Sequence, residues 1–299
     1  VTLAACANGT NKDIVTMKGD TITVSDFYNE IKTNQGAQQV LFQMTINKVF
    51  EKEYGSKVSD KEVDKELAKQ KKQLGNRFDA YLAQQGLTEE TAKKQIRSNM
   101  LLEYAVNQAA KKDIKESDYK AAFESYTPEV TAQIIKLDSE DKAKEVLEAA
   151  KAEGADFAQI AKDNSTDTTT KDKGGEVKFD SGTADIPSQV KEAAFKLDEN
   201  GISDVITVSA GQNYSASYYI VKLNKKTEKG SDWKKYEKRL KEIIVDGRKQ
   251  DTNYIRSIIA KAMTNANIKV KDDAFKSTFN QYLQNIGVQT SDSSSSSKK

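Results

Sequence analysis

The sequence predicts an α+β protein in which a mostly helical domain, built from both ends of the chain, is interrupted by a compact module of strands and helices. Apolar residues recur at helical spacing up to residue 128, and they do so again after residue 229. Between these regions, strand-like segments alternate with helical ones. Because helical regions bracket the module, we expect the two flanks to pack together as one discontinuous domain.

The first region, residues 13–128, should open with a β-hairpin. Residues 14–24 read IVTMKGDTITV, two β-prone runs separated by Gly19-Asp20. Apolar residues spaced three or four apart then predict a series of helices. These are expected from Ser25, over residues 37–54, from Asp60, from Glu89 through Tyr104, and around Tyr119 and Phe123, ending near Pro128.

Two of these helix starts carry capping signals. Ser59 and Glu62 form a capping box, in which each side chain bonds the backbone N–H of the other residue. Thr88 precedes Glu89 and Glu90, two acidic residues at the positive end of a helix dipole. The sequence therefore predicts both helices with defined first residues.

The pattern changes over residues 129–229. Strands are expected at VTAQIIKL (130–137), near residues 176–179, at ISDVITV (202–208) and at YYIVKL (218–223). Helices are expected around Val146 and Leu147, around Phe157 and Ile160, and over residues 188–197, with a Ser/Thr/Lys/Gly loop at 164–175. This is the composition of a compact α+β domain of about 100 residues.

Helical spacing returns over residues 230–286. The apolar residues of the first expected helix include Trp233, Tyr236 and Leu240, and Ile255, Ile259 and Met263 mark the second. The run NIKV (267–270) predicts a short strand, and Phe275, Phe279 and Tyr282 stripe a last helix. The serine-rich tail, residues 287–299, is expected to be disordered.

Composition excludes several kinds of chemistry. The chain has no histidine, which removes Ser-His-Asp and Cys-His catalysis and histidine-ligated metal sites. A single cysteine excludes thiolate metal clusters and an intrachain disulfide. The formal net charge of +2, with acidic and basic residues interspersed, indicates a solvated surface rather than a nucleic-acid interface. We therefore expect no metal, no cofactor and no nucleic acid.

The one cysteine stands near the beginning of the sequence. Leu3-Ala4-Ala5-Cys6 resembles the lipobox of bacterial lipoproteins, so residues 1–12 are interpreted as the end of a signal segment followed by a polar tether. In this interpretation Cys6 carries a diacylglycerol thioether and a second acyl group, such as palmitate, at its amino group. The protein is then expected at the cell membrane, on its extracellular face; the alternative is a free thiol.

Six segments in order resemble parvulin-type peptidyl-prolyl isomerase (rotamase) domains, which have an FKBP-like fold. They are VTAQIIKL, DFAQIAKDNSTD (156–167), Gly174-Gly175, VKEAAFKL (190–197), GISDVI (201–206) and YYIVKL. The whole plan, with its lipobox, helical flanks and serine-rich tail, is similar to the PrsA-type foldase lipoproteins of Gram-positive bacteria, streptococcal type. The resemblance implies an extracytoplasmic, membrane-anchored foldase whose helical region is a chaperone domain acting in protein secretion.

The resemblance also locates a degenerate isomerase site. Gln133 and Tyr219 stand at the positions of the family's two facing histidines, Ile186 and Val190 at those of its methionine and phenylalanine, and Asp167 keeps the acidic type. Rotation about a prolyl bond needs no proton transfer, so Gln133 and Tyr219 are expected to hydrogen-bond across the site as the histidines would. The smaller apolar contact surface that Ile186 and Val190 offer to a proline ring nevertheless predicts weak or absent isomerisation. No residue is assigned as catalytic with confidence.

Each site residue also has a plainer interpretation. Gln133, Phe179 and Tyr219 are candidates for contacting substrate, although Phe179 and Phe195 fit a core better than a ligand contact. Asp167 fits a turn cap as well as a functional acid. Trp233, at the start of an apolar helical face, is interpreted as a residue that packs against the core.

Three functions follow as hypotheses. The first is a chaperone that holds unfolded or partly folded secreted polypeptides, with a lipid anchor raising its concentration where they emerge. The second is an active isomerase that accelerates folding limited by X–Pro bonds. The third is a surface adhesin or solute-binding lipoprotein that shares only the anchor. A homodimer formed through the helical arms is an open alternative.

Overall fold

The computed structural model describes residues 12–210 and 215–283, so Cys6 and the serine-rich tail lie outside the described residues. The chain divides into two compact units. The helical unit consists of the residues up to Ile114 together with those from Val245 onward, and the sheet unit consists of Lys115–Ile244. Helix α10 (Glu237–Gln250) contributes residues to both units.

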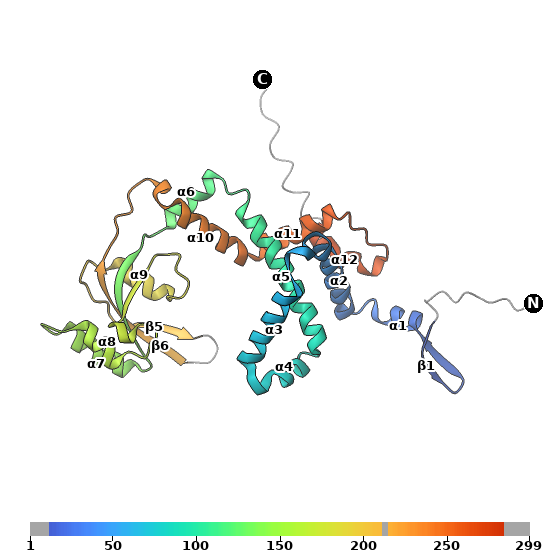
Figure 1. Cartoon of the computed structure of the whole chain (residues 1–299), viewed down its shortest axis with the longest axis horizontal. Helices are drawn as coiled ribbons and strands as arrows, with labels where there is room; N and C mark the ends of the chain where they lie inside the picture. The colour runs from blue at the N-terminus through green and yellow to red at the C-terminus, as the bar shows by residue number, and fades with distance from the viewer. Residues whose placement is uncertain (1–11, 211–214, 284–299) are drawn as a thin grey trace, which may run out of the picture. The chain divides into compact units, whose positions relative to one another are not determined.

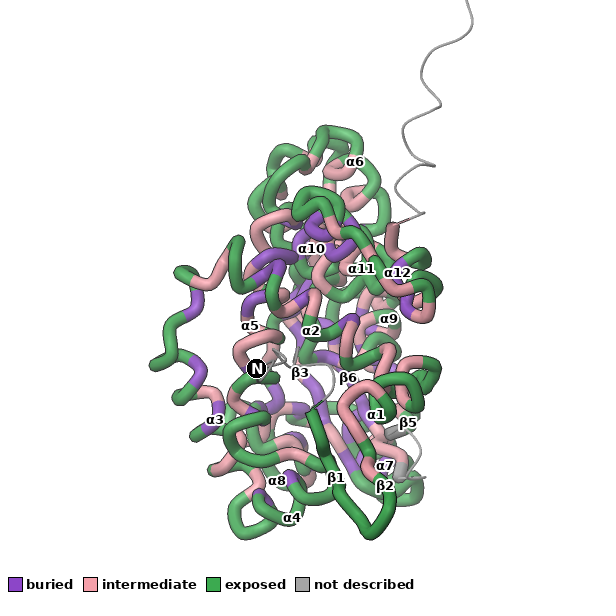
Figure 2. Tube along the Cα trace, turned by 90° about the vertical axis from the view of Figure 1, so that its right-hand side faces the viewer, coloured by how far each residue is buried: buried purple, intermediate pink, exposed green. Residues whose placement is uncertain are grey.

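The helical unit begins with the predicted hairpin. Strands β1 (Asp13–Met17) and β2 (Asp20–Thr23) pair antiparallel, and β1 is exposed along its length (Figure 2). The helices that follow in this unit are α1 (Val24–Ile31), α2 (Gln35–Tyr54), α3 (Asp60–Leu74), α4 (Phe78–Gln84), α5 (Glu89–Lys111), α11 (Thr252–Asn265) and α12 (Lys276–Leu283).

Both ends of the chain contribute to the core of the helical unit. The ring of Phe42 in α2 lies 5.4 Å from the ring of Phe279 and 4.4 Å from that of Tyr282, both in α12. Leu101 in α5 and Met263 in α11 are buried in the same cluster. The two ring pairs join residues more than two hundred positions apart, so the predicted discontinuous helical domain is confirmed, although its expected inner boundaries at residues 128 and 230 shift to Ile114 and Val245.

The capping signals are also confirmed. The backbone N–H of Ser59 donates to the Glu62 carboxylate at 2.7 Å, and the N–H of Glu62 donates to the Ser59 hydroxyl at 3.3 Å. Thr88 accepts from the N–H of Thr91 at 3.2 Å at the start of α5. Each bond satisfies a donor that the first helical turn leaves without a partner, so these helices begin at the predicted residues.

The sheet unit is an α+β arrangement around one antiparallel sheet in the order β4-β3-β6-β5. Its strands are β3 (Val130–Leu137), β4 (Glu176–Phe179), β5 (Ile206–Ala210) and β6 (Ser215–Lys225). Its helices are α6 (Glu116–Ser125), α7 (Glu140–Lys151), α8 (Phe157–Asn164), α9 (Ser188–Lys196) and the first part of α10.

Each face of this sheet packs against different helices (Figure 1). On one face, Val130, Ala132 and Ile134 of β3 form a core with Val190 and Ala194 of α9. The opposite face packs on α7 and α8, and its core is formed by Ile135, Leu137, Val146, Phe157, Ala161 and Ile220. Because side chains alternate along a strand, the parity of a residue number on β3 or β6 decides which helices that residue meets.

One helix was not predicted, and two predicted strands differ from the structure. Helix α4 was not predicted because it is only two turns long, with Phe78 and Leu82 as its buried pair. The strand expected over 202–208 begins at Ile206, and Ile202 forms only an isolated bridge with Lys222. The predicted strand 267–270 is wrong, since this segment pairs with no described strand.

Candidate functional site

The predicted isomerase site lies on the α9 side of the sheet. Tyr219 on β6 pairs with Lys136 on β3 and with Ile206 on β5, and its ring belongs to the core cluster that contains Ile186 and Val190. Tyr219 is 9% exposed, Ile186 is 8% exposed and Val190 is fully buried. The structure therefore brings these three predicted positions together, and they fill the space between the sheet and α9.

Asp167 lies in the loop that follows α8 and points its carboxylate at its own turn. It accepts hydrogen bonds from the Thr169 N–H at 3.0 Å, the Thr169 hydroxyl at 2.6 Å and the Thr170 hydroxyl at 2.8 Å. Burial raises the pKa of Asp167, but these bonds and the charge of Lys136 outweigh it and hold the pKa below its ordinary value. Asp167 thus acts as the cap of this turn.

Asp167 and Tyr219 nevertheless influence each other electrostatically. Burial raises the pKa of the Tyr219 phenol, and the negative charge of Asp167 raises it further. The Tyr219 hydroxyl makes no hydrogen bond to another group in the described part of the chain. At neutral pH this phenol is therefore protonated and has a hydroxyl able to donate a hydrogen bond.

Lys136 is a member of this site that the sequence interpretation missed. It lies opposite Tyr219 in the β3–β6 ladder, and its charge acts on Asp167. Its backbone holds the loop in place, because its N–H donates to the Ser165 hydroxyl at 3.1 Å and its carbonyl accepts from the Thr166 N–H at 2.8 Å. The sequence signal that could have found it is strand parity, once the register of β3 with β6 is known.

Gln133 lies on the other face of the sheet. It pairs with Lys222 on β6, three residues from Tyr219, and its amide donates to the carbonyl of Gly174 at 2.9 Å. An odd separation on a strand places two side chains on opposite faces. The expectation that Gln133 and Tyr219 hydrogen-bond across one site is therefore wrong, and Gln133 instead fixes the turn before β4.

Phe179, the remaining substrate-contact candidate, is a core residue. It is 1% exposed, and its ring lies 5.8 Å from the ring of Phe195 in the α9-side cluster. Trp233 also packs, since its ring stacks on that of Tyr119 at 5.0 Å. The packing interpretation is the one that the geometry favours for Phe179 and Trp233.

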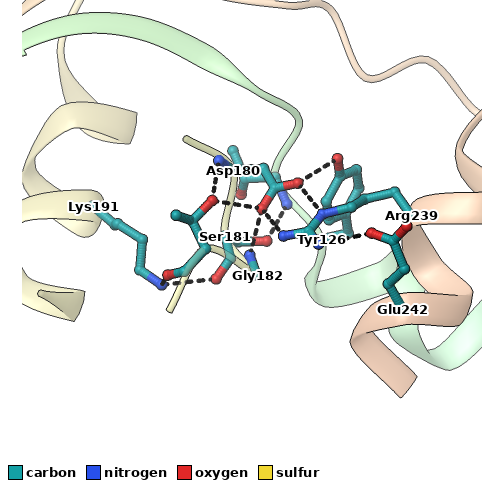
Figure 3. Close-up of polar contacts among 9 residues, drawn as sticks. Tyr126, Asp180, Ser181, Gly182, Lys191, Arg239 and Glu242 are labelled. Carbon is teal, nitrogen blue, oxygen red and sulfur yellow. Dashed lines mark hydrogen bonds and ion pairs between the residues drawn. The ribbon is translucent and has the colours of Figure 1, made fainter. Parts of the chain in front are cut away.

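A polar cluster around Asp180 was not anticipated from the sequence (Figure 3). The Arg239 guanidinium on α10 donates to both carboxylate oxygens of Asp180, at 2.6 and 2.8 Å. The same carboxylate accepts from the Tyr126 hydroxyl at 3.1 Å, the Gly182 N–H at 2.9 Å and the Thr183 hydroxyl at 3.1 Å. The cluster joins residues from three distant parts of the sheet unit around one buried carboxylate.

The charges of this cluster stabilise one another. Burial raises the pKa of Asp180, but the hydrogen bonds and the charge of Arg239 outweigh it and hold the pKa below its ordinary value. The bond to Asp180 raises the pKa of Arg239, and burial together with the Asp180 charge raises the pKa of Tyr126. The cluster is therefore structural: its carboxylate is saturated with donors and is poorly placed for proton transfer.

We expect the free energy of unfolding of the sheet unit to fall in acid. Asp167 and Asp180 both have lowered pKa values in the folded state, so the unfolded chain binds protons first as the pH drops. Their contribution is complete above the unfolded aspartate pKa of about 3.9 and is lost as the pH falls through the folded values. Urea unfolding at a series of pH values, followed by the fluorescence of Trp233, measures it.

Asp180→Asn should reduce this acid dependence, since one of the two titrating carboxylates is gone while Asp167 remains. Asp172→Asn is the matched control, because Asp172 is exposed. Identical pH dependence in Asp180→Asn and the unsubstituted protein would contradict the role assigned to Asp180.

The fold and this site define the class of protein. A four-stranded antiparallel sheet with α9 on one face and α7 and α8 on the other, with Tyr219, Ile186 and Val190 between sheet and α9, is a parvulin-type domain. In agreement, the family described as "Rotamase: PPIC-type PPIASE domain" matches residues 126–225.

Comparison of the whole chain gives the particular family. The chain is 61% identical to "Foldase protein PrsA" of Streptococcus sanguinis over 285 residues, covering 95% of this chain and 85% of that protein. The crystal structure of foldase protein PrsA from Streptococcus pneumoniae is 55% identical, with a TM-score of 0.82 over 91% of this chain and 99% of that one. PrsA from Lactococcus lactis is 38% identical, with a TM-score of 0.67 over 91% and 99% of the two chains. The chain belongs to the PrsA family of foldase proteins.

Within the described ranges, no helix is both long and apolar enough to cross a bilayer, and no three acidic or cysteine side chains gather where they could hold a metal ion.

Proposed function

We propose that this foldase works on the outer face of a cell membrane, held there by lipid on Cys6, and assists secreted polypeptides chiefly by holding them. The Leu3-Ala4-Ala5-Cys6 motif supports the anchor. The family supports unfolded polypeptides as clients. In this proposal isomerisation at the parvulin site is weak or absent.

The main support for weak or absent isomerisation is that the protein's own side chains fill the parvulin site. Val190 is fully buried, and Ile186 and Tyr219 are each less than a tenth exposed, so little apolar surface is left to grip a proline ring. Gln133 lies behind the sheet and offers no partner for Tyr219. A catalyst of prolyl rotation must hold the twisted amide better than the planar one, and these side chains leave few groups for that task.

The holding activity is supported by the exposed apolar side chains of the helical unit. Phe27 on α1 is 52% exposed, and Val40 and Met44 on α2 are 60% and 51% exposed. Isolated exposed apolar residues are ordinary, but Val40 and Met44 lie on one helix face and line one groove. Such a surface binds apolar stretches of many sequences weakly and reversibly.

We expect the protein to suppress aggregation of an unfolded client that contains no proline, at about stoichiometric concentration, as measured by light scattering. Val40→Gln with Met44→Gln should weaken this suppression severalfold, because it removes apolar contact from an exposed surface. Lys241→Gln, an exposed substitution on α10, is the matched control. A protein that leaves aggregation of the client unchanged would not be a holding chaperone.

An active isomerase is the second candidate function, favoured by the protonated Tyr219 hydroxyl beside Asp167 and Lys136. A proline-peptide isomerisation assay separates the two functions. We expect little acceleration. Strong turnover that is lost in Tyr219→Phe would instead establish catalysis at this site.

A further inference from the structure

The segment Ile268–Lys271 between α11 and α12 has the side-chain pattern of a strand, but none of the described strands pairs with it. Ile268 and Val270 are half-buried against the core of the helical unit, whereas Lys269 and Lys271 are exposed. Alternation with a period of two is typical of an edge strand with one face on a core. The β-prone sequence therefore has the side-chain alternation of an edge strand but no partner among the described strands.

From Lys269 to Lys271 the main chain of this segment also makes no hydrogen bond within the described part of the chain. The N–H of Ile268 donates to the Met263 carbonyl at 3.2 Å. The N–H and C=O groups of Lys269, Val270 and Lys271 make no hydrogen bond to other groups of the described chain. In an extended segment the main-chain groups of alternate residues point to the same edge, so Lys269 and Lys271 offer their N–H and C=O groups together, and such an edge is the feature to which an added strand binds.

An apolar groove of about 600 Å³ runs beside the segment. Residues 267–272 line the groove together with Val40, Leu41 and Met44 of α2 and with Phe275 and Phe279. A strand that paired with the segment would place every second side chain toward these apolar residues. The groove therefore supplies side-chain contacts for the same occupant that the free main chain would bond.

The charged residues at the edge of the groove, Lys269 and Lys271, indicate which kind of peptide would bind there. Neither Lys269 nor Lys271 forms an ion pair with any described residue. The nearby carboxylate of Asp272 is engaged, since it accepts from the Tyr28 hydroxyl at 2.6 Å and from the Ala274 N–H at 2.9 Å. The rim thus offers two free positive charges, and the complementary occupant is acidic at alternate positions.

We propose that a client segment with alternating apolar and acidic residues binds here as an added β-strand along Lys269–Lys271, with its apolar side chains in the groove and its carboxylates against the two lysines. This inference rests on the proposed holding function and deepens it. It gives the foldase a mode of recognition that reads the client backbone and requires no proline.

The probe is a fluorescent peptide of about six residues, a common strand length, that alternates valine and glutamate. Fluorescence anisotropy with the whole protein measures its affinity. The same peptide N-methylated at the amides of one edge keeps its side chains but loses those donors. We expect N-methylation to weaken binding about tenfold, from the loss of about two main-chain hydrogen bonds. Equal binding of both peptides overturns strand addition.

Charge reversal provides a test that a misfolded variant cannot imitate. Lys269→Glu with Lys271→Glu should lower the affinity for the valine–glutamate peptide about tenfold. The same variant should bind a valine–lysine peptide more tightly than the unsubstituted protein does. Unchanged peptide preference after charge reversal overturns the proposal.

Two further outcomes are separable. If a second copy of the chain fills the groove, sedimentation shows a dimer that the peptide dissociates, and the groove is then a self-association surface instead. If the protein suppresses client aggregation but binds no peptide, strand addition fails while the holding function stands. If the unsubstituted protein does not suppress client aggregation, the holding function itself is contradicted.

Discussion

Replacing Asp180 by alanine is expected to lower the free energy of unfolding of the sheet unit by about 3 kcal/mol. The Asp180 side chain is 9% exposed and accepts both arms of the Arg239 guanidinium. Removing it leaves the Tyr126 hydroxyl, the Gly182 N–H and the Thr183 hydroxyl without their acceptor. The effect lies at the lower end for a broken buried pair, because the Arg239 side chain is 32% exposed and can recover water.

Glu242→Ala is the matched control for Asp180→Ala. Glu242 accepts from the same guanidinium at 3.1 Å, but its side chain is 49% exposed, and exposed pairs contribute less than about 1 kcal/mol. Urea unfolding monitored by Trp233 fluorescence measures both variants within the same unit. Equal small losses in the two variants would show that the Asp180 cluster contributes no more than an ordinary surface pair.

Gly175→Ala is expected to destabilise the sheet unit by about 3 kcal/mol, from strain and crowding together. Gly175 has φ of +79°, a conformation that L residues rarely adopt. Its carbonyl accepts from the Ile134 N–H at 2.8 Å, which brings the two backbones together. A Cβ at this position would lie against the carbonyl oxygen of Ile134, and neither backbone can retreat without breaking the β3–β4 ladder.

Gly154→Ala separates the two causes. Gly154 also has a positive φ, +73°, but a Cβ there meets no atom within 4 Å. It should cost only the conformational strain, about 1 kcal/mol. A Gly175→Ala loss no larger than that of Gly154→Ala would exclude crowding as the reason for glycine at residue 175.

The caps and the periodic apolar stripes predicted most of the helices because these signals are local. Ser59 with Glu62 satisfies donors within one turn, and the structure shows both bonds. The segment 267–270 failed for the opposite reason: its β-prone residues are strand-like, but a strand also needs a neighbour, and none of the described strands lies beside it. The short α4 fell below the length at which periodicity is informative.

The site was predicted less well than the fold. Its acidic and apolar positions, Asp167, Ile186 and Val190, could be placed by resemblance, and the last two do meet Tyr219. Gln133 could not be placed, because the face on which a strand residue lies depends on register with a partner strand. Lys136 was overlooked for the same reason.

By itself, the sequence determined that this protein contains an α+β module within a helical domain and that no imidazole takes part in its chemistry. Helix caps, apolar periodicity and the Gly174-Gly175 pair act over a few residues, so they can be read along the chain. Only the tertiary structure decided that Gln133 and Tyr219 lie on opposite faces and that Arg239 neutralises Asp180. Pairing register and buried ion pairs join distant residues, and only the folded chain brings those residues together.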